Sequence, residues 1–477
     1  MEFLTTMGLE VHCELSTKTK IFCSCSTEFG GEPNTHVCAV CSGMPGTLPV
    51  LNEKVVEYAI RTGIATNCQI TRYNKFDRKN YFYPDLPKAY QVSQLYLPIC
   101  HNGHVDIEVN GAKKAIRIKE IHMEEDAGKL IHDPLDDSTL VDYNRCGVPL
   151  LEIVSEPDFE SREEVIAYLT KLKAILQYIG VSDCKMEQGS LRADVNISVR
   201  PVGTTKLGTR TEMKNINSFK AIARAIEWET ERQIDLIEDG GKVIQETRRW
   251  DDTKGKSYAM RSKENAQDYR YFPEPDLVPI EISDEWIEKV KKSLPELPTE
   301  KKERYIREYG LPEYDVDIIT SSKYLVKIFE EALEVCNEPK EVSNWIMGEL
   351  LRLASETSTE YENIKFDAAN LGKLILLLKN KTINRNTAKE VFEKMFAENV
   401  EPEKYIKENR LEMTNDAGAV KSVVDAVIAA NPKSVEEYKA GNTKVSRHLM
   451  GQCMKQLKGK ADPASVNEAI TEALKEL

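Results

Sequence analysis

Residues 9–15 read LEVHCEL, and this short stretch alternates apolar and polar side chains with a period of two. In a β-strand such a period places Glu10, His12 and Glu14 on one face and the apolar residues on the other. Carboxylate and imidazole groups spaced in this way can reach one divalent ion, and Mg²⁺ prefers oxygen ligands. The stretch therefore predicts a strand with a metal-binding face, although an exposed edge strand would show the same alternation.

A second acidic cluster lies in residues 121–129, IHMEEDAGK, after another alternating run. Glu124, Glu125 and Asp126 are consecutive, and such crowding of carboxylates costs free energy unless a cation relieves it. A solvated turn before Gly128 would tolerate the same charges without a metal. The presence of other polar strands in the same chain favours the metal-site interpretation of this cluster.

Those strands are found in residues 192–200, RADVNISVR, and residues 209–215, TRTEMKN. The first presents Arg192 and Asp194 on its polar face, and the second presents Lys214. Several strands that turn mixed charges toward one concavity suit a Mg²⁺-nucleotide site, because carboxylates hold the metal while Lys and Arg neutralise phosphate oxygens. Neither a Walker-type GxxxxGK[ST] motif nor a GxGxxG motif occurs, which disfavours a P-loop or Rossmann site.

Residues 75–91, KFDRKNYFYPDLPKAYQ, mix aromatic and basic side chains with proline turns. Aromatic rings can stack on bases while Arg and Lys hold phosphate, so this segment is a candidate substrate loop. A tyrosine-rich loop packed on a sheet edge would have the same composition. The candidate residues are Arg78, Lys79, Tyr81 and Lys88.

The strongest local motif pairs a CxC knuckle, Cys23 and Cys25, with a CxxC knuckle, Cys38 and Cys41. Four thiolates supply a complete tetrahedral shell for Zn²⁺ and leave no open position, so such a site would be structural. A set of free reduced thiols is the alternative. Because the chain has 11 cysteines, an odd number, and most of the others lie scattered, a disulfide framework is not expected.

Composition and charge exclude several classes of protein. The 477 residues are 41% hydrophobic and 30% charged, which allows about three domains with substantial cores and excludes a mainly disordered chain. The 65 Lys and Arg against 78 Asp and Glu give a net charge of -13, which excludes a globally basic nucleic-acid coat. Without an apolar run of roughly 20 residues or a leader peptide, we expect a cytoplasmic protein with no membrane contact.

The pattern along the chain predicts three domains. Residues 1–292 alternate strand-like runs with a few helices, the clearest of which begins at Ser161 and ends at Gly180, and this predicts an α+β domain. Residues 293–408 are charged and helix-rich, which predicts an all-α domain. Short amphipathic helices separated by turn signals fill residues 409–477 and predict a small helical tail.

The tail contains a basic segment in an otherwise acidic chain. Between Lys439 and Lys460 there are six Lys or Arg residues and no acidic residue. In a helical projection one side of this segment is basic and the opposite side is apolar. The basic side is a candidate contact for a phosphate backbone, although a solvated amphipathic face would look the same. It comprises Lys444, Arg447, His448, Gly451, Lys455 and Lys458.

Longer motifs carry a resemblance to a known family. They are GLEVHCEL, CSGMPGTLPVLN, FDRKNYFYPDLPKAYQVSQ, HMEEDAGK, LVDYNRCGVPLLEIVSEPD, MEQGSLRADVNISVR, EMKNINSF, QETRRWDD and DYRYFPEPD. Together they resemble the GatB subunits of the tRNA-dependent amidotransferase GatCAB, and the similarity extends through the helical region into the tail. The resemblance implies an antiparallel-sheet cradle domain related in fold to glutamine synthetase, then a helical domain and a YqeY-like tail domain that contacts tRNA.

The same resemblance implies site residues and cofactors. In the family, ATP and Mg²⁺ bind in the cradle, which by motif places Glu10, His12 and Glu125 at the magnesium ion as catalytic residues. Zinc cysteines occur in part of the family, and this chain retains all four. Weaker candidates for nucleotide or substrate contacts are Glu124, Glu187, Arg192, Asp194 and Lys214.

The implied activity is an amidation in two steps. ATP phosphorylates the side-chain carboxylate of Glu-tRNA(Gln) and/or Asp-tRNA(Asn), and ammonia then displaces phosphate from the acyl phosphate. The implied partners are the misacylated tRNA, the GatA subunit, which supplies ammonia through a channel, and the GatC subunit. Two alternatives stay open on the sequence: a stand-alone ATP-dependent carboxylate-amine ligase, and a non-enzymatic, zinc-stapled RNA-binding protein.

Overall fold

The structure is a computed structural model that describes residues 2–132, 138–262, 269–413, 417–439, 445–457, 461 and 463–475. The chain divides into two compact units, Met1–Pro298 and Thr299–Leu477. Each unit is described by itself.

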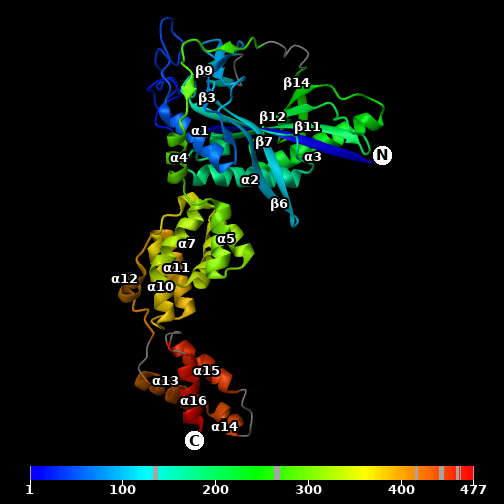
Figure 1. Cartoon of the computed structure of the whole chain (residues 1–477). Helices are drawn as coiled ribbons and strands as arrows, with labels where there is room; N and C mark the ends of the chain where they lie inside the picture. The colour runs from blue at the N-terminus through cyan, green and yellow to red at the C-terminus, as the bar shows by residue number, and fades with distance from the viewer. Residues whose placement is uncertain are drawn as a thin grey trace. The chain divides into compact units, whose positions relative to one another are not determined.

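The first unit is built on a nine-stranded sheet with the strand order β14-β13-β12-β11-β1-β10-β7-β6-β2 (Figure 1). Neighbouring strands are antiparallel, except that β12 and β13 are parallel. The LEVHCEL stretch lies near the end of β1, a central strand, so it is not an edge strand. The strands are β1 (Phe3–Glu14), β2 (Gln69–Ile70), β6 (Cys100–Val109), β7 (Ala112–Glu125), β10 (Pro149–Ser155), β11 (Leu191–Pro201), β12 (Thr211–Lys214), β13 (Glu246–Asp251) and β14 (Lys256–Ser262).

Three small sheets accompany the large one. They pair β15 (Phe272–Pro273), β4 (Asp77–Asn80) and β5 (Tyr90–Ser93); β16 (Ile280–Glu281) and β3 (Tyr73–Asn74); and β8 (Lys129–His132) and β9 (Thr139–Asp142). The candidate substrate loop therefore includes β4 and the start of β5, and residues 272–273 add a third strand to it.

Helices cover the apolar face of the large sheet. The helices α1 (Glu53–Ala65), α2 (Arg162–Tyr178) and α3 (Phe219–Glu238) pack on β6, β7 and β11, and α4 (Asp284–Ser293) packs on α1 (Figure 1). Met7, Leu9, Val11 and Cys13 of β1 are buried in the core that these helices close. One face of the sheet is thus sealed, and the opposite face carries the polar side chains.

The predicted boundaries of the helix from Ser161 to Gly180 are confirmed. Ser161 Oγ accepts a hydrogen bond from the backbone N–H of Glu164 at 3.2 Å, which caps α2, and Gly180 follows the helix with φ +70°. Ser218 caps α3 in the same way through the N–H of Ala221, at 3.1 Å. These caps fix where each helix begins against the sheet.

The second unit contains only helices among the residues that the structure describes there. Val420, Leu449 and Val466 belong to a separate hydrophobic core in the C-terminal part of the unit. No helix in the described ranges is long and apolar enough to cross a membrane. The elements are α5 (Pro298–Tyr309), α6 (Glu313–Thr320), α7 (Lys323–Cys336), α8 (Pro339–Trp345), a π-helical turn (Ile346–Leu350), α9 (Leu351–Glu356), α10 (Ala368–Lys379), α11 (Arg385–Glu398), α12 (Pro402–Glu408), α13 (Ala417–Ala430), α14 (Pro432–Lys439), α15 (Val445–Gln456) and α16 (Pro463–Lys475).

The expectation of a mixed α/β part with a large, mainly antiparallel sheet, followed by helical sequence, is confirmed at this level. The predicted first boundary, at residue 292, lies six residues before the division between the two compact units, at Pro298. The further division of the helical part near residue 408 stays a prediction.

Candidate active site on the polar face of the sheet

The register of β1 with its two neighbours brings charged side chains together. His12 lies opposite Glu152 on β10 and Arg192 on β11, and Glu10 lies opposite Asp194 on β11. Because side chains alternate along each strand, all these residues point to the face that the helices leave open. Polar residues from remote parts of the sequence thus meet on one surface.

The first ligand group on this face consists of His12, Glu124 and Glu152, whose potential ligand atoms all lie within 4.8 Å of one another. His12 Nε2 lies 3.8 Å from Oε1 of each carboxylate, and Ser93 Oγ donates to Glu124 Oε2 at 3.1 Å. Burial and the charge of Glu152 raise the pKa of Glu124. Burial also opposes ionisation of Glu152, but His12, His122 and Lys79 together outweigh burial and hold the pKa of Glu152 below its usual value.

The second ligand group consists of Glu10, Asp194 and Glu212, again with ligand atoms within 4.8 Å of one another. Lys214 forms an ion pair with Asp194 and lies 3.3 Å from Glu212 Oε1. Burial lowers the pKa of Lys214, but Asp194 and Glu212 outweigh burial and raise it. Burial and the neighbouring Glu152 and Glu212 raise the pKa of Glu10. The crowded carboxylates are therefore balanced by a cation from the chain itself.

The described residues do not bring Glu10, His12 and Glu125 into one group of ligand atoms, as the predicted magnesium set requires. Glu10 and His12 fall into the two separate groups. Glu124 and Glu125 are consecutive on β7 and so point to opposite faces, and the pairing with β10 turns Glu124 toward the site. Sequence alone gives two adjacent carboxylates but not the strand register.

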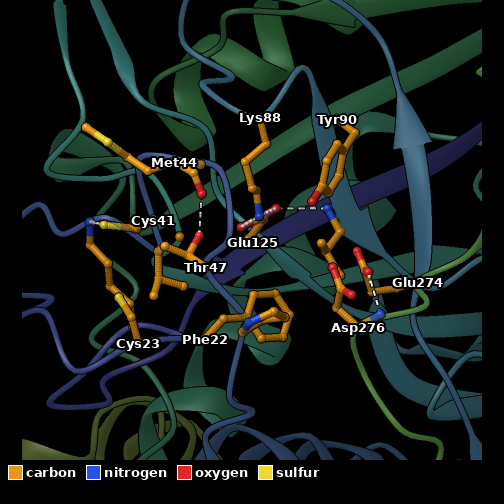
Figure 2. Close-up of a pocket in the computed structure, with 16 residues that line it drawn as sticks. Phe22, Cys23, Cys41, Met44, Thr47, Lys88, Tyr90, Glu125, Glu274 and Asp276 are labelled. Carbon is orange, nitrogen blue, oxygen red and sulfur yellow. Dashed lines mark hydrogen bonds and ion pairs between the residues drawn. The ribbon is translucent and has the colours of Figure 1, made fainter.

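Glu125 lies instead in a pocket beside the cysteine cluster (Figure 2). Its carboxylate accepts hydrogen bonds from Lys88 Nζ at 2.8 Å and from the backbone N–H of Val92 at 2.9 Å. Phe22 and Cys41 line the same pocket. Lys88, a predicted substrate residue, is therefore held in an ion pair with Glu125.

A third set of charges lies beside the ligand groups. Arg192 forms an ion pair with Asp126, and Arg145 Nε lies 3.7 Å from Asp126 Oδ2. Burial raises the pKa of Asp126, but Arg192 and Arg145 outweigh burial and lower it to about 2. Burial and the negative charge of Asp126 raise the pKa of Glu14 to about 9. Glu14 is therefore a neutral carboxylic acid at pH 7.

The basic and aromatic residues of the predicted substrate loop are placed in different ways. Arg78 is neutralised within the chain, because it donates to both carboxylate oxygens of Glu274, at 2.7 and 2.8 Å, and to Asp276 at 3.0 Å. Tyr81 donates a hydrogen bond to Gln91 Oε1 at 3.3 Å. Their contacts stabilise the loop and its pairing with residues 272–273.

Lys79 is the loop residue that faces the ligand groups. Its Nζ lies 5.0 Å from the ring centroid of Tyr269 and 5.6 Å from that of Tyr81. Burial lowers the pKa of Lys79, but Tyr271 and Glu124 outweigh burial and raise it. Lys79 therefore remains a cation near the first ligand group. Glu187, by contrast, is exposed in a 3-10 turn, Met186–Gln188.

The four cysteines of the two knuckles meet as one cluster. The thiol sulfurs of Cys23, Cys25, Cys38 and Cys41 all lie within 4.8 Å of one another, and none is in a disulfide. The hydrogen bond from Cys23 lowers the pKa of Cys41 to about 4, and Lys20 contributes in the same direction. A set of four thiols with one ready thiolate fits a tetrahedral divalent metal.

Sequence reasoning missed Glu152, which completes the first ligand group. Its signal was present, because Glu152 is the one polar residue within LLEIV, residues 150–154. A lone carboxylate in an otherwise apolar central strand must face a polar partner or a ligand. The motif that contains Glu152 contributed only to the family resemblance.

In the second unit, the predicted basic face is partly described. Arg447, His448, Gly451 and Lys455 are placed on α15 and are all exposed, and Val445, Leu449 and Cys453 are buried on its other side. Lys444 and Lys458 lie outside the described residues. The predicted two-sided helix is thus present, and its contact with tRNA stays a prediction.

This sheet, with helices on one face and two ligand groups on the other, belongs to the class of GatB/GatE catalytic domains. A model of the GatB/GatE catalytic domain matches residues 5–288, more than half of the chain, and a model of the GatB domain matches residues 327–474. The chain therefore belongs to the GatB family.

Individual relatives agree over nearly the whole length. The B subunit of the aspartyl/glutamyl-tRNA(Asn/Gln) amidotransferase of Lachnoclostridium phytofermentans is 64% identical over 470 residues, which is 98% of this chain and 98% of that protein. The proteins of the same name from Agathobacter rectalis and Caldicellulosiruptor bescii are 62% and 60% identical, over 98% and 100% of this chain and 99% and 100% of theirs.

Proposed function

We propose that this chain is the subunit that activates and amidates the amino acid of a misacylated tRNA. ATP would phosphorylate the side-chain carboxylate of Glu-tRNA(Gln) and/or Asp-tRNA(Asn), and ammonia would attack the acyl carbon and expel phosphate. A GatA partner would supply the ammonia and a GatC partner would join the assembly. The names of the relatives support this substrate class.

The observation that carries the proposal is the meeting of ligand groups and cations on the open face of the large sheet. Phosphoryl transfer to a carboxylate brings two anions together, so the site must neutralise charge without hydrolysing the product. Lys79 and Lys214 provide fixed cations beside the two ligand groups. Both can hold phosphate oxygens while the carboxylate is positioned for attack.

The oxygen-rich groups also fit divalent ions. We place Mg²⁺ at Glu10, Asp194 and Glu212, and a second ion at His12, Glu124 and Glu152, where it would offset phosphate charge. The buried Asn196 Oδ1, which has no hydrogen-bond partner within the described part of the chain, lies on the same face. Glu125 stands outside both groups while it is paired with Lys88.

The fold relation, the zinc site, the tail domain and the cellular location are also proposals. We infer that the large sheet is the cradle of a glutamine-synthetase-like fold, supported by its antiparallel pairing and one-sided helical cover. The cysteine cluster would hold structural Zn²⁺, and the separate core around Leu449 supports a YqeY-like tail domain. A cytoplasmic location would follow from the tRNA substrate.

The test is ATP hydrolysis and amide formation by the chain assembled with GatA and GatC. Both should depend on misacylated tRNA, and Glu-tRNA(Gln) and Asp-tRNA(Asn) are assayed separately with glutamine as nitrogen donor. ATP turnover that ignores tRNA would favour the stand-alone ligase. Tight tRNA binding without any turnover would favour the RNA-binding protein.

A further inference from the structure

An open cavity of about 620 Å³ lies at the edge of the large sheet where β12, β13 and β14 meet. Ligand pockets fall between roughly 300 and 1,000 Å³, so its size is sufficient for a nucleotide. Its lining residues lie outside both ligand groups. They include Asn215, Asn217, Arg249, Lys254 and Tyr258.

Strand register places two lining residues of this cavity, Arg249 and Tyr258, on the same face as the ligand groups, whereas Ser218 and Ala221 at the start of α3 line its other side. Lys214 on β12 pairs with Arg249 on β13, and Arg249 pairs with Tyr258 on β14. The preceding residue, Arg248, points to the opposite face, where its guanidinium lies 5.7 Å from the ring centroid of Trp228 on α3. Arg249 therefore continues the row of cations that begins with Lys214, beside Asp194.

The carboxylates of the cavity are already neutralised. Asp251 accepts a hydrogen bond from the backbone N–H of Lys254 at 3.1 Å and lies 3.5 Å from its Nζ. Asp252 accepts hydrogen bonds from Arg224 at 2.6 Å and from Trp250 Nε1 at 2.9 Å. These pairs leave the cavity without an unbalanced negative charge.

Arg249 is the unbalanced charge. Its side chain is exposed, and across the described ranges it makes no hydrogen bond or ion pair with the protein. An arginine fork offers paired donors that match a phosphate group. The cavity therefore presents a free phosphate-binding group next to the second ligand group.

The other lining residues suit the rest of a nucleotide. Tyr258 is 46% exposed, and Lys254 Nζ lies 5.5 Å from the centroid of its ring. An exposed ring that already faces a cation is a stacking platform for a base. Asn217 adds an exposed amide, which can bond to a base edge or a ribose hydroxyl.

We propose that this cavity is a nucleotide-binding subsite, in which Arg249 binds a phosphate and Tyr258 stacks on a base. The inference rests on the proposed function, because it takes the neighbouring carboxylates as the reaction centre. Phosphate next to that centre has two sources, ATP and the single-stranded 3′ end of the tRNA. The shared chemistry is a phosphate one nucleotide away from the reacting carboxylate.

The experiment measures equilibrium binding by the assembled complex, without catalysis. The three probes are ATP, intact tRNA, and the same tRNA shortened by about four nucleotides, which removes the single-stranded 3′ end. The variants are Arg249→Ala, Arg249→Lys and Tyr258→Ala. Lys242→Ala, an exposed basic residue outside the cavity, is the matched control.

Arg249→Ala and Tyr258→Ala should each raise the Kd of one probe about tenfold or more, the usual effect of losing a charged hydrogen bond or a stacked base. An effect on ATP alone assigns the cavity to ATP. An effect on intact but not shortened tRNA assigns it to the 3′ end. Arg249→Lys should retain part of the affinity, because it keeps the charge and loses the fork.

An unchanged Kd for all three probes, or equal weakening of both tRNAs, would overturn the subsite. Because both side chains are exposed, thermal unfolding midpoints should stay at the wild-type value. If the wild-type complex forms no amide while Arg249→Ala still weakens one probe, the proposed function fails and the subsite stands. If the wild-type complex forms the amide normally and the variants bind all three probes with the wild-type Kd, the proposed function stands and the subsite fails.

Discussion

The polar face of the large sheet and the basic face of α15 both carry charge, but they hold it differently. Glu124 and Glu212 are buried, and each lies beside titratable groups from other strands of the sheet. Arg447 and Lys455 lie on one helix and make no ion pair within the described part of the chain. The first face works as a coupled set, whereas the second acts as separate charges screened by salt.

Removing one carboxylate from the coupled set should have the largest effect. Glu152→Gln keeps the shape of the side chain but takes the charge from the first ligand group, so amide formation should fall about 100-fold or more. Single-turnover amidation of misacylated tRNA measures the loss.

The matched control for this change is Glu108→Gln, a carboxylate on β6 of the same sheet that lies outside both ligand groups. Its rate should equal that of the wild type, and both variants should remain folded at the assay temperature. If Glu152→Gln amidates at the wild-type rate, the ligand group is a structural charge cluster and the contrast between the two faces loses its basis.

The cysteine cluster is a third set of close ligand atoms, and we expect its metal to stabilise the fold without taking part in the reaction. Cys38→Ser should release zinc and lower the free energy of unfolding by about 3 kcal/mol, the contribution of a ligand present at about 100 times its Kd. Zinc analysis and urea unfolding measure the two effects, with Cys68→Ser as a control outside the cluster. Zinc content equal in wild type and variant would contradict the assignment.

Glu14 gives the coupled face a signature in pH. Its pKa is about 9 in the folded chain, because burial and Asp126 disfavour its charge, against about 4.3 when unfolded. Below the pKa of the unfolded chain, Glu14 is protonated in both states. As the pH rises above about 4.3, the unfolded chain releases this proton while the folded chain keeps it, so the free energy of unfolding should fall between about pH 4.3 and 9. Glu14→Gln mimics the neutral acid and should flatten this slope in urea unfolding from about pH 5 to 9. An unchanged slope would show that Glu14 is ionised in the folded chain.

Local patterns predicted well, and pairings between strands did not. The alternation around His12 and the hydroxyl cap of α2 depend on a few consecutive residues, as do the two cysteine knuckles within residues 23–41. Sequence could not choose between Glu124 and Glu125, since a shift of one residue in register exchanges the faces. Arg249 was missed because its significance comes from its pairing with Lys214, a strand contact between residues remote in sequence.

The basic face of α15 should give the smallest and most regular effects. Arg447→Glu and Lys455→Glu should each weaken tRNA binding a few-fold and reduce the slope of log K against log salt by about 1, because each removes one phosphate contact. Lys421→Glu, an exposed lysine on α13, is the matched control for charge reversal in the same part of the chain. Binding measured at several salt concentrations separates the cases. Since separate charges add, the double variant should lose the sum of the two slopes, and a loss far above that sum would mean that this face is coupled as well.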